Sequence, residues 1–286
     1  MEYSRILENK NTITSIITGH QTNQIAENFS IRFVFNGNEN CSIGRRQLTV
    51  HSDSFLIINK GTAFASNNDS RNAVSIFSIG FDDDFLQKFN ARYFKGSKAI
   101  LFDPAHFDSP LCETIYPFKD DLRIHVESLK DYLENNETAD ELLINEYLHK
   151  CLLCCYRVYN EEVFQKAKKL NFLHLDTRME ILRRLNLAKE YLYTNYDKNI
   201  NLESLANYAC LSVNHLLRTF KLAYNQSPHQ FLIQIRLQRA QSLLSKTEYP
   251  VYEIVNMVGF KCTSSFIRLF RNRYQTTPLK YRNIAA

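Results

Sequence analysis

A sequence pattern near the C-terminus of the chain occurs twice, in two copies about 50 positions apart. The copies share these pairs: Leu205 and Ile254, Leu211 and Phe260, Arg218 and Arg268, Phe220 and Phe270, and Pro228 and Pro278. The offset is 49 residues at the first two pairs and 50 at the others, so the second copy carries one extra residue in between. Self-similarity of this kind predicts two similar structural units, and therefore two matched docking surfaces.

Each copy predicts two short helices joined by a tight turn. Apolar residues recur at helical spacing, stop at the turn and resume on the second helix. Ser212 is placed to cap the second helix of the first copy, and Gly259 can adopt the positive φ that a sharp turn needs. The pattern is typical of a duplicated helix-turn-helix. The inward apolar residues are Leu202, Leu205, Ala206, Ala209, Leu216 and Phe220 in one copy, and Val251, Ile254, Val255, Val258, Phe266 and Phe270 in the other.

The outward faces of the two second helices carry groups suited to a DNA major groove. At spacings of three, four and seven residues these are Asn214, Leu217, Arg218 and Lys221 in the first copy, and Ser264, Ile267, Arg268 and Arg271 in the second. Arg can bind guanine with two hydrogen bonds, Asn can bind adenine, and Leu or Ile can contact a thymine methyl. Two solvated faces of a helical domain are the alternative, which the duplication disfavours.

The segment between the copies predicts a bridging helix. Residues 228–246 are nineteen positions with apolar residues at helical spacing, and Pro228 is tolerated in the first turn. At about 1.5 Å per residue such a helix covers about 28 Å, which is close to one turn of B-DNA, about 34 Å. A rigid helix of this size could hold two recognition helices over successive major-groove segments.

From about Asn186 to Arg282 the chain resembles the AraC/XylS family of transcription regulators. The second copy carries the resemblance in order, with Val251, Glu253, Ile254, Val255, Val258, Gly259, Phe260, Phe266, Arg268, Phe270, Arg271, Thr277, Pro278, Tyr281 and Arg282. The resemblance implies an all-α domain of about seven helices. It implies base contacts by Asn214, His215, Leu217 and Arg218, and by Thr263, Ser264, Ile267 and Arg268. It implies phosphate contacts by Ser212, Lys221, Ser265, Arg271, Arg273 and Lys280.

Three residues depart from the family pattern at its turns. Cys210 stands where the family usually has Gly, Asn225 replaces the Gly after the first recognition helix, and Gln275 replaces the counterpart after the second. Asn adopts the left-handed conformation at modest cost, whereas Cys210 and Gln275 are less comfortable there. Whether the first recognition helix engages DNA as tightly as the second is therefore open. Val255, where the family prefers Ala, should only widen local packing.

Positive charge is concentrated on the duplicated region. Residues 201–286 hold 11 Lys or Arg against three acids, a balance of +8, whereas the whole chain is at +5 and the first 200 residues therefore sum to −3. A basic surface attracts the phosphate backbone and gives affinity that falls with salt. A solubility surface is the alternative, but such surfaces usually mix both signs.

The first part of the chain predicts a β domain. Strands are expected at residues 13–17, 29–35, 47–50, 55–58 and 73–79, with turn formers between them. Short strands at this spacing favour a small barrel or jelly roll, and the family resemblance implies a cupin-like one. We therefore expect an α+β multidomain chain: a cupin-like β-barrel regulatory domain at 1–105, a helical extension and linker at 106–175, and the DNA-binding domain at 176–286.

The pattern turns helical after Phe81. Asp82-Asp83-Asp84 predicts the start of a helix carrying Phe85, Phe89 and Phe94. A stripe of Leu122, Val126, Leu129 and Leu133 follows, and a third helix is expected over roughly 139–170. Packing of the stripe on the chain's own barrel is favoured over a dimer seam. The lysines at 166, 168 and 169 indicate the linker.

Catalytic and metal chemistry find little support in the sequence. Metal cupins pair two His residues, but only Ser52 and Asp53 follow His51. His20, His106, His125, His149 and His174 are scattered. No nucleophile elbow, Gly-rich phosphate loop or acidic cluster is present. We expect no enzyme, cofactor or metal; a cupin-like enzyme or small-molecule-binding protein with a DNA-binding appendage is the alternative.

The cysteines and the N-terminus predict a cytoplasmic location. Cys151, Cys154 and Cys155 lie among apolar residues at helical spacing and lack a second pair, so buried thiols are favoured over zinc. Seven cysteines without a framework fit a reducing compartment. The start of the chain lacks a signal-peptide pattern, and no apolar run approaches eighteen residues, so no membrane partner is expected.

Double-stranded DNA is the predicted partner. A small-molecule effector, RNA polymerase and a second copy of the chain, as a homodimer, are further candidates. Five aromatic residues, Phe33, Phe35, Phe55, Phe64 and Phe77, could line an effector cavity or form plain core, and the sequence leaves both open. It identifies neither the target DNA nor whether binding activates or represses.

Overall fold

The computed structural model describes residues 2–18, 21–68, 74–93, 111–136 and 138–285. It divides into two compact units, residues 1–168 and 169–286. The division lies a few residues before the predicted boundary at 175. The predicted boundary between 105 and 106, and Phe94, His20 and His106, lie outside the described residues.

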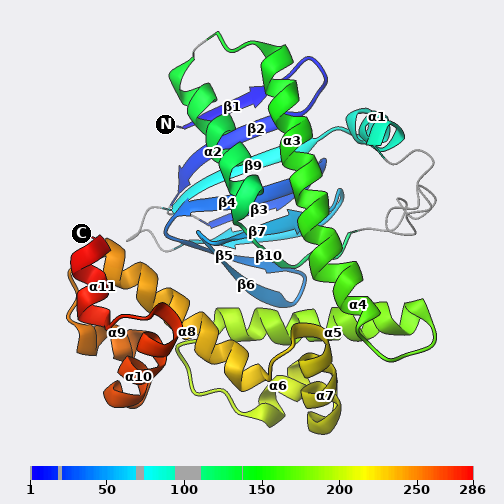
Figure 1. The fold of residues 1–286 in the computed structure, drawn as a ribbon. Helices are drawn as coiled ribbons and strands as arrows, with labels where there is room; N and C mark the ends of the chain where they lie inside the picture. Colours follow the sequence, from blue (N-terminus) through cyan, green and yellow to red (C-terminus); the bar gives the residue numbers. More distant parts are fainter. Residues whose placement is uncertain (1, 19–20, 69–73, 94–110, 137, 286) are drawn as a thin grey trace. The chain divides into compact units, whose positions relative to one another are not determined.

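Two antiparallel sheets form the first unit (Figure 1). The larger sheet has, in spatial order, β1 (Tyr3–Ile6), β2 (Thr12–Thr18), β9 (Val74–Phe81), β4 (Phe29–Asn36), β7 (Ser54–Ile58) and β10 (Ile115–Pro117). The smaller sheet has β3 (Gln21–Ile25), β8 (Ala63–Asn67), β5 (Asn38–Ile43) and β6 (Arg46–His51). The predicted strands correspond to β2, β4, β6, β7 and β9. The other five strands were not predicted.

Aromatic side chains fill the core of this unit. Phe33, Phe55 and Phe77 are fully buried, and the Phe33 ring centroid lies 5.5 Å from that of Phe55 and 4.7 Å from that of Phe118. These rings pack on one another as core, which supports a role in the core over the lining of an effector cavity for these residues. A buried ion pair accompanies them: Arg32 on β4 donates from Nε to both carboxylate oxygens of Glu39 on β5 at 2.8 Å.

The helices of the first unit follow the predicted order. They are α1 (Asp83–Tyr93), α2 (Asp120–Asn135) and α3 (Glu141–Tyr159), which continues through a π-helical turn (Asn160–Gln165) into α4 (Lys166–Lys168). All four residues of the predicted stripe on α2 are buried. Arg123 and Lys130 of α2 lie over the rings of Phe118 and Phe35. Packing of the stripe within its own unit is therefore supported over the dimer seam.

Seven helices form the second unit, as the family resemblance implied. They are α5 (Leu175–Thr194), α6 (Leu202–Tyr208), α7 (Val213–Tyr224), α8 (Pro228–Lys246), α9 (Val251–Met257), α10 (Thr263–Tyr274) and α11 (Pro278–Ala285). The bridging helix α8 has the predicted bounds. Ser227 and Gln230 form a capping box at its start, each side chain bonding the other's backbone N–H, which explains why the helix begins at Pro228.

Candidate nucleic-acid interface

The two turns that precede α7 and α10 have the same hydrogen-bond geometry. Leu211 N donates to Ala206 O at 2.9 Å in the first turn, and Phe260 N donates to Val255 O at 3.0 Å in the second. Cys210 and Gly259 occupy the left-handed position in these turns, with φ of 53° and 81°. Both turns are therefore Schellman motifs. A non-glycine residue holds the first at a cost of about 1–2 kcal/mol.

The extra residue of the second copy lies where the offset indicated. Four residues separate α6 from α7, whereas five separate α9 from α10. Aligning the N-cap residues Ser212 and Cys262 makes Lys261 the insertion. Asn225 and Gln275, after the two recognition helices, also have positive φ, 56° and 58°. All three departures from the family pattern thus adopt the left-handed conformation.

Helix α7 is anchored by its apolar face and leaves its polar face free. Leu216 and Phe220 are fully buried. Asn214, Arg218 and Lys221 are exposed, as is Ser212 at the cap. His215 and Leu217 are half-buried. The predicted base-contacting residues of the first copy thus lie on one helix, with His215 and Leu217 at the edge of the free face.

Helix α10 repeats this arrangement. Phe266 and Phe270 are fully buried, and Ser265 is half-buried. The predicted residues that are exposed are Thr263, Ser264, Ile267, Arg268, Arg271 and Arg273 on α10, and Lys280 on α11. Six residues of the second predicted set are therefore exposed on one helix, and Lys280 is exposed on the next.

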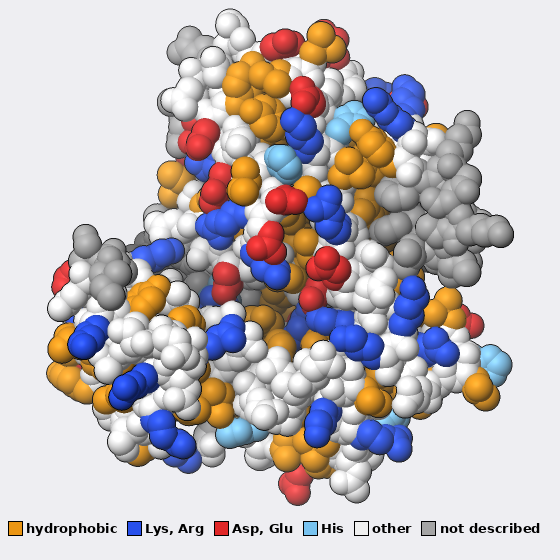
Figure 2. Space-filling view, viewed as in Figure 1, with side chains coloured by type: hydrophobic (Ala, Val, Ile, Leu, Met, Phe, Trp, Pro, Cys, Tyr) orange, Lys and Arg blue, Asp and Glu red, His pale blue; other side chains and the backbone are white. Residues whose placement is uncertain are grey.

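Cations on these faces are free to meet an external anion. Within the described part of the chain, Arg218, Lys221, Arg268 and Arg271 form no ion pair with a carboxylate. Arg183 and Arg184 of α5, in contrast, both pair with Glu180 at 2.8 Å. On the face of the helical unit seen in Figure 2, Lys and Arg side chains predominate over Asp and Glu. Unpaired cations on a recognition helix suit binding to a polyanion.

His215 contacts an aromatic residue that the sequence did not indicate. Its ring centroid lies 6.0 Å from that of Phe172, in the segment before α5. Burial, together with the nearby charges of Arg218 and Arg184, lowers the pKa of His215. A neutral imidazole offers one donor and one acceptor, so this side chain would contribute hydrogen bonds rather than charge.

The N-caps of the two recognition helices differ in chemistry. Ser212 Oγ accepts a hydrogen bond from His215 N at 3.3 Å. At the equivalent position of α10, the Sγ of exposed Cys262 lies 3.0 Å from Ser264 Oγ. Hydrogen bonds from Ser264 and Ser265 lower the pKa of the Cys262 thiol to about 7. Sequence reasoning missed this thiol; its alignment with Ser212 at a cap position was the available signal.

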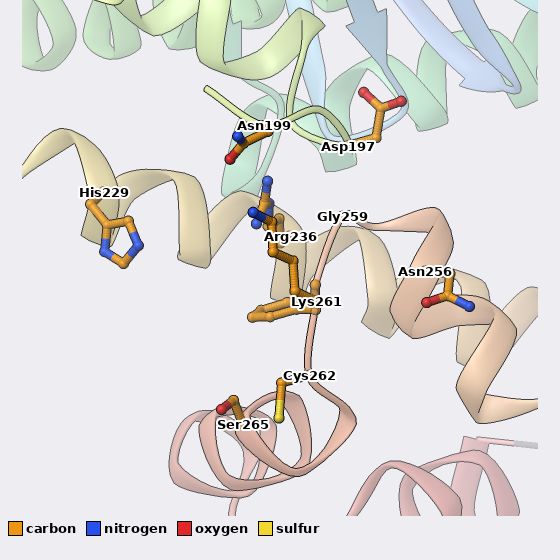
Figure 3. A pocket seen from close by; sticks show the side chains of 10 residues that line it. Asp197, Asn199, His229, Arg236, Asn256, Gly259, Lys261, Cys262 and Ser265 are labelled. Atoms are coloured by element: carbon orange, nitrogen blue, oxygen red, sulfur yellow. The ribbon is translucent and has the colours of Figure 1, made fainter. Parts of the chain in front are cut away.

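The two recognition helices lie apart on a common support. Helix α8 packs against α5 and α7 on one side and against α9 and α11 on the other. Figure 1 shows α7 and α10 at separate places along the unit, both at its lower edge in that view. Beside α10 lies a cleft of about 610 Å³, formed by the loop before α6, by α8, by the α9–α10 turn and by the start of α10. Figure 3 shows its lining residues, among them Asp197, Arg236, Gly259 and Lys261.

The described residues give little support for metal binding, reactive buried thiols or a membrane-spanning helix. Among the described residues, no three His, Cys, Asp or Glu side chains gather as a metal site requires. Burial raises the pKa values of the Cys151, Cys154 and Cys155 thiols, as expected for thiols packed in a helix core. No described helix has the length and apolar character needed to span a bilayer.

Comparisons with known proteins divide at the same place as the fold. A helix-turn-helix domain family matches residues 205–284, and the ExsA N-terminal regulatory domain family matches residues 29–154. The chain is 33% identical over 105 residues to the raffinose operon transcriptional regulatory protein RafR of Pediococcus pentosaceus. This match covers 37% of this chain and 38% of that protein. It is 22% identical over 261 residues to the Msm operon regulatory protein of Streptococcus mutans, covering 90% of this chain and 85% of the relative.

A solved structure also matches part of the chain. The DNA-binding domain of the global transcriptional factor AdpA, determined in complex with a target DNA, is 27% identical with a TM-score of 0.34. The match covers 35% of this chain and 91% of that domain. The chain thus spans about two fifths of the raffinose regulator's length and most of the Msm regulator's.

Proposed function

Because the chain belongs to the AraC/XylS family of transcription regulators, we propose that it binds double-stranded DNA sequence-specifically, with α7 and α10 in successive segments of the major groove. The family consists of regulators rather than enzymes, so the enzyme alternative is set aside. One observation carries the proposal: two helix-turn-helix units share a supporting helix, and each presents unpaired cations on an exposed recognition face.

Each predicted contact residue takes a role by its position. The exposed side chains of Asn214, Arg218, Thr263, Ser264, Ile267 and Arg268 read base edges, with His215 and Leu217 at the margin of the first surface. Phosphate oxygens are bound by Ser212 and Lys221 around the first helix, and by Ser265, Arg271, Arg273 and Lys280 around the second. Phosphate contacts fix the position on the duplex, while base contacts supply the sequence preference.

The first unit serves regulation in this proposal. The match to an N-terminal regulatory domain family supports an input from a small-molecule effector, from a second copy of the chain, or from both. RNA polymerase is the partner through which a bound regulator would act on transcription. Binding to chromosomal DNA would place the protein in the cytoplasm.

Selection of bound DNA from a random pool by the full chain tests this function. We expect enrichment of a bipartite site whose halves lie about one helical turn apart. A variant carrying Arg218→Ala together with Arg268→Ala is the matched control, because it should keep salt-dependent binding but lose the enrichment. If the wild-type chain retains no DNA better than random competitor at moderate salt, the proposal is wrong.

A further inference from the structure

The two helix-turn-helix units are joined by more than helix α8. Residues from the loop after α5, from α8 and from the α9–α10 turn meet beside the cleft shown in Figure 3. We call this group the clasp and define it as Tyr196, Asp197, Arg236, Gly259 and Phe260. The loop leads into the first helix-turn-helix, and the turn belongs to the second, so the clasp connects the two directly.

Arg236 is the central member of the clasp. Its Nε donates to Tyr196 O at 2.7 Å, and its Nη2 donates to Lys198 O at 2.8 Å. The same guanidinium lies over the Phe260 ring, 5.7 Å from the centroid. One side chain on the supporting helix thus contacts the backbone of the loop that leads into the first helix-turn-helix and an aromatic ring of the second. Hydrogen bonds from a charged donor are stronger than neutral ones, and the planar fork limits the geometry.

Gly259 brings the second helix-turn-helix into backbone contact with the loop that leads into the first. A Cβ at this position would lie 2.5 Å from Asp197 O and 2.8 Å from Asp197 C, which is closer than any side chain allows. The corresponding residue of the first copy, Cys210, keeps a similar backbone conformation but is exposed. Positive φ alone does not require glycine, since Cys210 has it too. Glycine is required at 259 because the Asp197 backbone leaves no room for a side chain.

Tyr196 extends the connection into the second core. It packs against the buried cluster formed by α8, α9 and α10, which includes Ile254, Phe266 and Phe270. Arg239 of α8 lies over the Tyr196 ring at 6.0 Å. A residue of the loop after α5 thus contributes to the packing of the second helix-turn-helix. Backbone contact, hydrogen bonds and ring packing together restrict hinge and twist motions that a single shared helix would permit.

We propose that the clasp fixes the distance and angle between α7 and α10, and so determines which half-site spacing the protein accepts; this rests on the proposed function. Arg236 is a positioning residue that touches no base in this scheme. One inserted base pair displaces the second half-site by about 3.4 Å and rotates it by about 34°. Two rigidly joined modules cannot follow such a shift, because the effective concentration of the second contact collapses when the geometry does not match.

The test compares spacing profiles of the full chain and its variants. Once a bipartite site has been selected, affinities are measured for that site, for sites with one base pair added or removed between the halves, and for the second half-site alone. Arg236→Met removes both hydrogen bonds while keeping an apolar stem against Phe260. Gly259→Ala opens the clasp from the other side. Arg184→Met is the matched control, since Arg184 lies outside the clasp: it pairs with Glu180 on its own helix and donates to Cys210 O at 2.9 Å in the turn of the first helix-turn-helix.

We expect the wild type and Arg184→Met to lose at least about 30-fold in affinity when the spacing changes by one base pair. Arg236→Met and Gly259→Ala should bind the selected spacing about 10-fold more weakly, but vary by no more than about 3-fold across the three spacings. Binding of the second half-site alone should stay at the wild-type level, which shows that the second helix-turn-helix remains folded.

Each other result overturns the proposal. A wild type that tolerates one base pair more or less has no fixed spacing to explain. Variants that bind more weakly but keep the wild-type spacing profile would show that the clasp does not set the angle. Loss of half-site binding in both variants would show that the clasp stabilises the recognition units themselves. A wild type that selects no sequence at all would instead contradict the proposed function, so the two failures are distinguishable.

Discussion

Replacing Arg268 by Ala is expected to weaken DNA binding in a base-dependent way. Arg268 is exposed on α10 and forms no ion pair with a carboxylate in the described part of the chain. Removing such a side chain should change the free energy of unfolding by no more than about 0.5 kcal/mol. The loss of affinity can therefore be attributed to the lost contact with DNA rather than to unfolding.

The expected magnitude follows from the type of contact. A two-bond Arg–guanine pair contributes about 1–3 kcal/mol of discrimination, which is about 5- to 150-fold in affinity. Lys280→Ala removes one exposed cation as well, but from a predicted phosphate contact. It should weaken binding to all sequences alike and reduce the slope of log affinity against log salt by about 0.9. Between 50 and 200 mM salt, the variant should therefore lose about 3.5-fold less affinity than the wild type loses.

Fluorescence anisotropy titrations separate the two effects. Each variant is titrated with the selected site and with every single-base change in its second half-site, at several salt concentrations. Arg268→Ala should flatten the preference at one base pair and leave the others as in the wild type. If Arg268→Ala and Lys280→Ala lower affinity for all sequences by the same factor, our division into base-reading and phosphate-binding residues is wrong.

Three further perturbations test other features of the structure. The rate of alkylation of Cys262 should rise with pH to a half-maximum near pH 7, because hydrogen bonds from Ser264 and Ser265 favour the thiolate; bound DNA should slow it, and a rate unaffected by DNA would separate this thiol from the interface. Arg32→Met should destabilise the first unit by about 3–5 kcal/mol, because it leaves the Glu39 carboxylate buried without its partner; combining it with Glu39→Leu should recover most of the lost urea resistance, and no recovery would contradict this cause. Gln275→Gly should raise the free energy of unfolding by up to about 1 kcal/mol, and with it the urea midpoint, since it removes a non-glycine residue from the left-handed conformation. A lower urea midpoint would show that the added chain entropy of glycine outweighs the relieved strain.

The helical unit was predictable because its signals are local and are repeated. A capping residue, an apolar period and a turn residue each lie within a few positions of the element they define, as Ser212 does for α7. The second copy then confirmed the interpretation of the first, down to the additional residue in the turn. Outward and inward faces follow from helical spacing alone, so the grouping of Arg218 with Lys221, and of Arg268 with Arg271, needed no tertiary information.

The β unit was only half predictable, since some of its strands carry few apolar residues and β10 is only three residues long. Strands β3 (Gln21–Ile25) and β5 (Asn38–Ile43) have sequences rich in Asn, Gln and Ser, which are typical of loops. Part of their pairing is distant in sequence: β3 pairs with β8, and β5 pairs with β8 as well as with the adjacent strand β6. Pairing of this kind stabilises a strand whatever its own propensity. The burial of Arg32 and Glu39 was also not predicted; it is possible because each neutralises the charge of the other across the two sheets.

The connection between the two recognition units shows most clearly where sequence reasoning ends. Positive φ at Gly259 is a local property, and the turn pattern predicts it. The approach of Asp197 to that glycine is not local, because the two residues are brought together by the packing of α5 and α9 against α8. Arg236 presents the same difficulty, since in the sequence it is one basic residue on a helix that predicts only a bridge. Its two carbonyl partners lie about forty residues away. The residues that we propose to read DNA can thus be inferred from the face of one helix, whereas those that we propose to set the distance between two such helices become apparent only when the chain is folded.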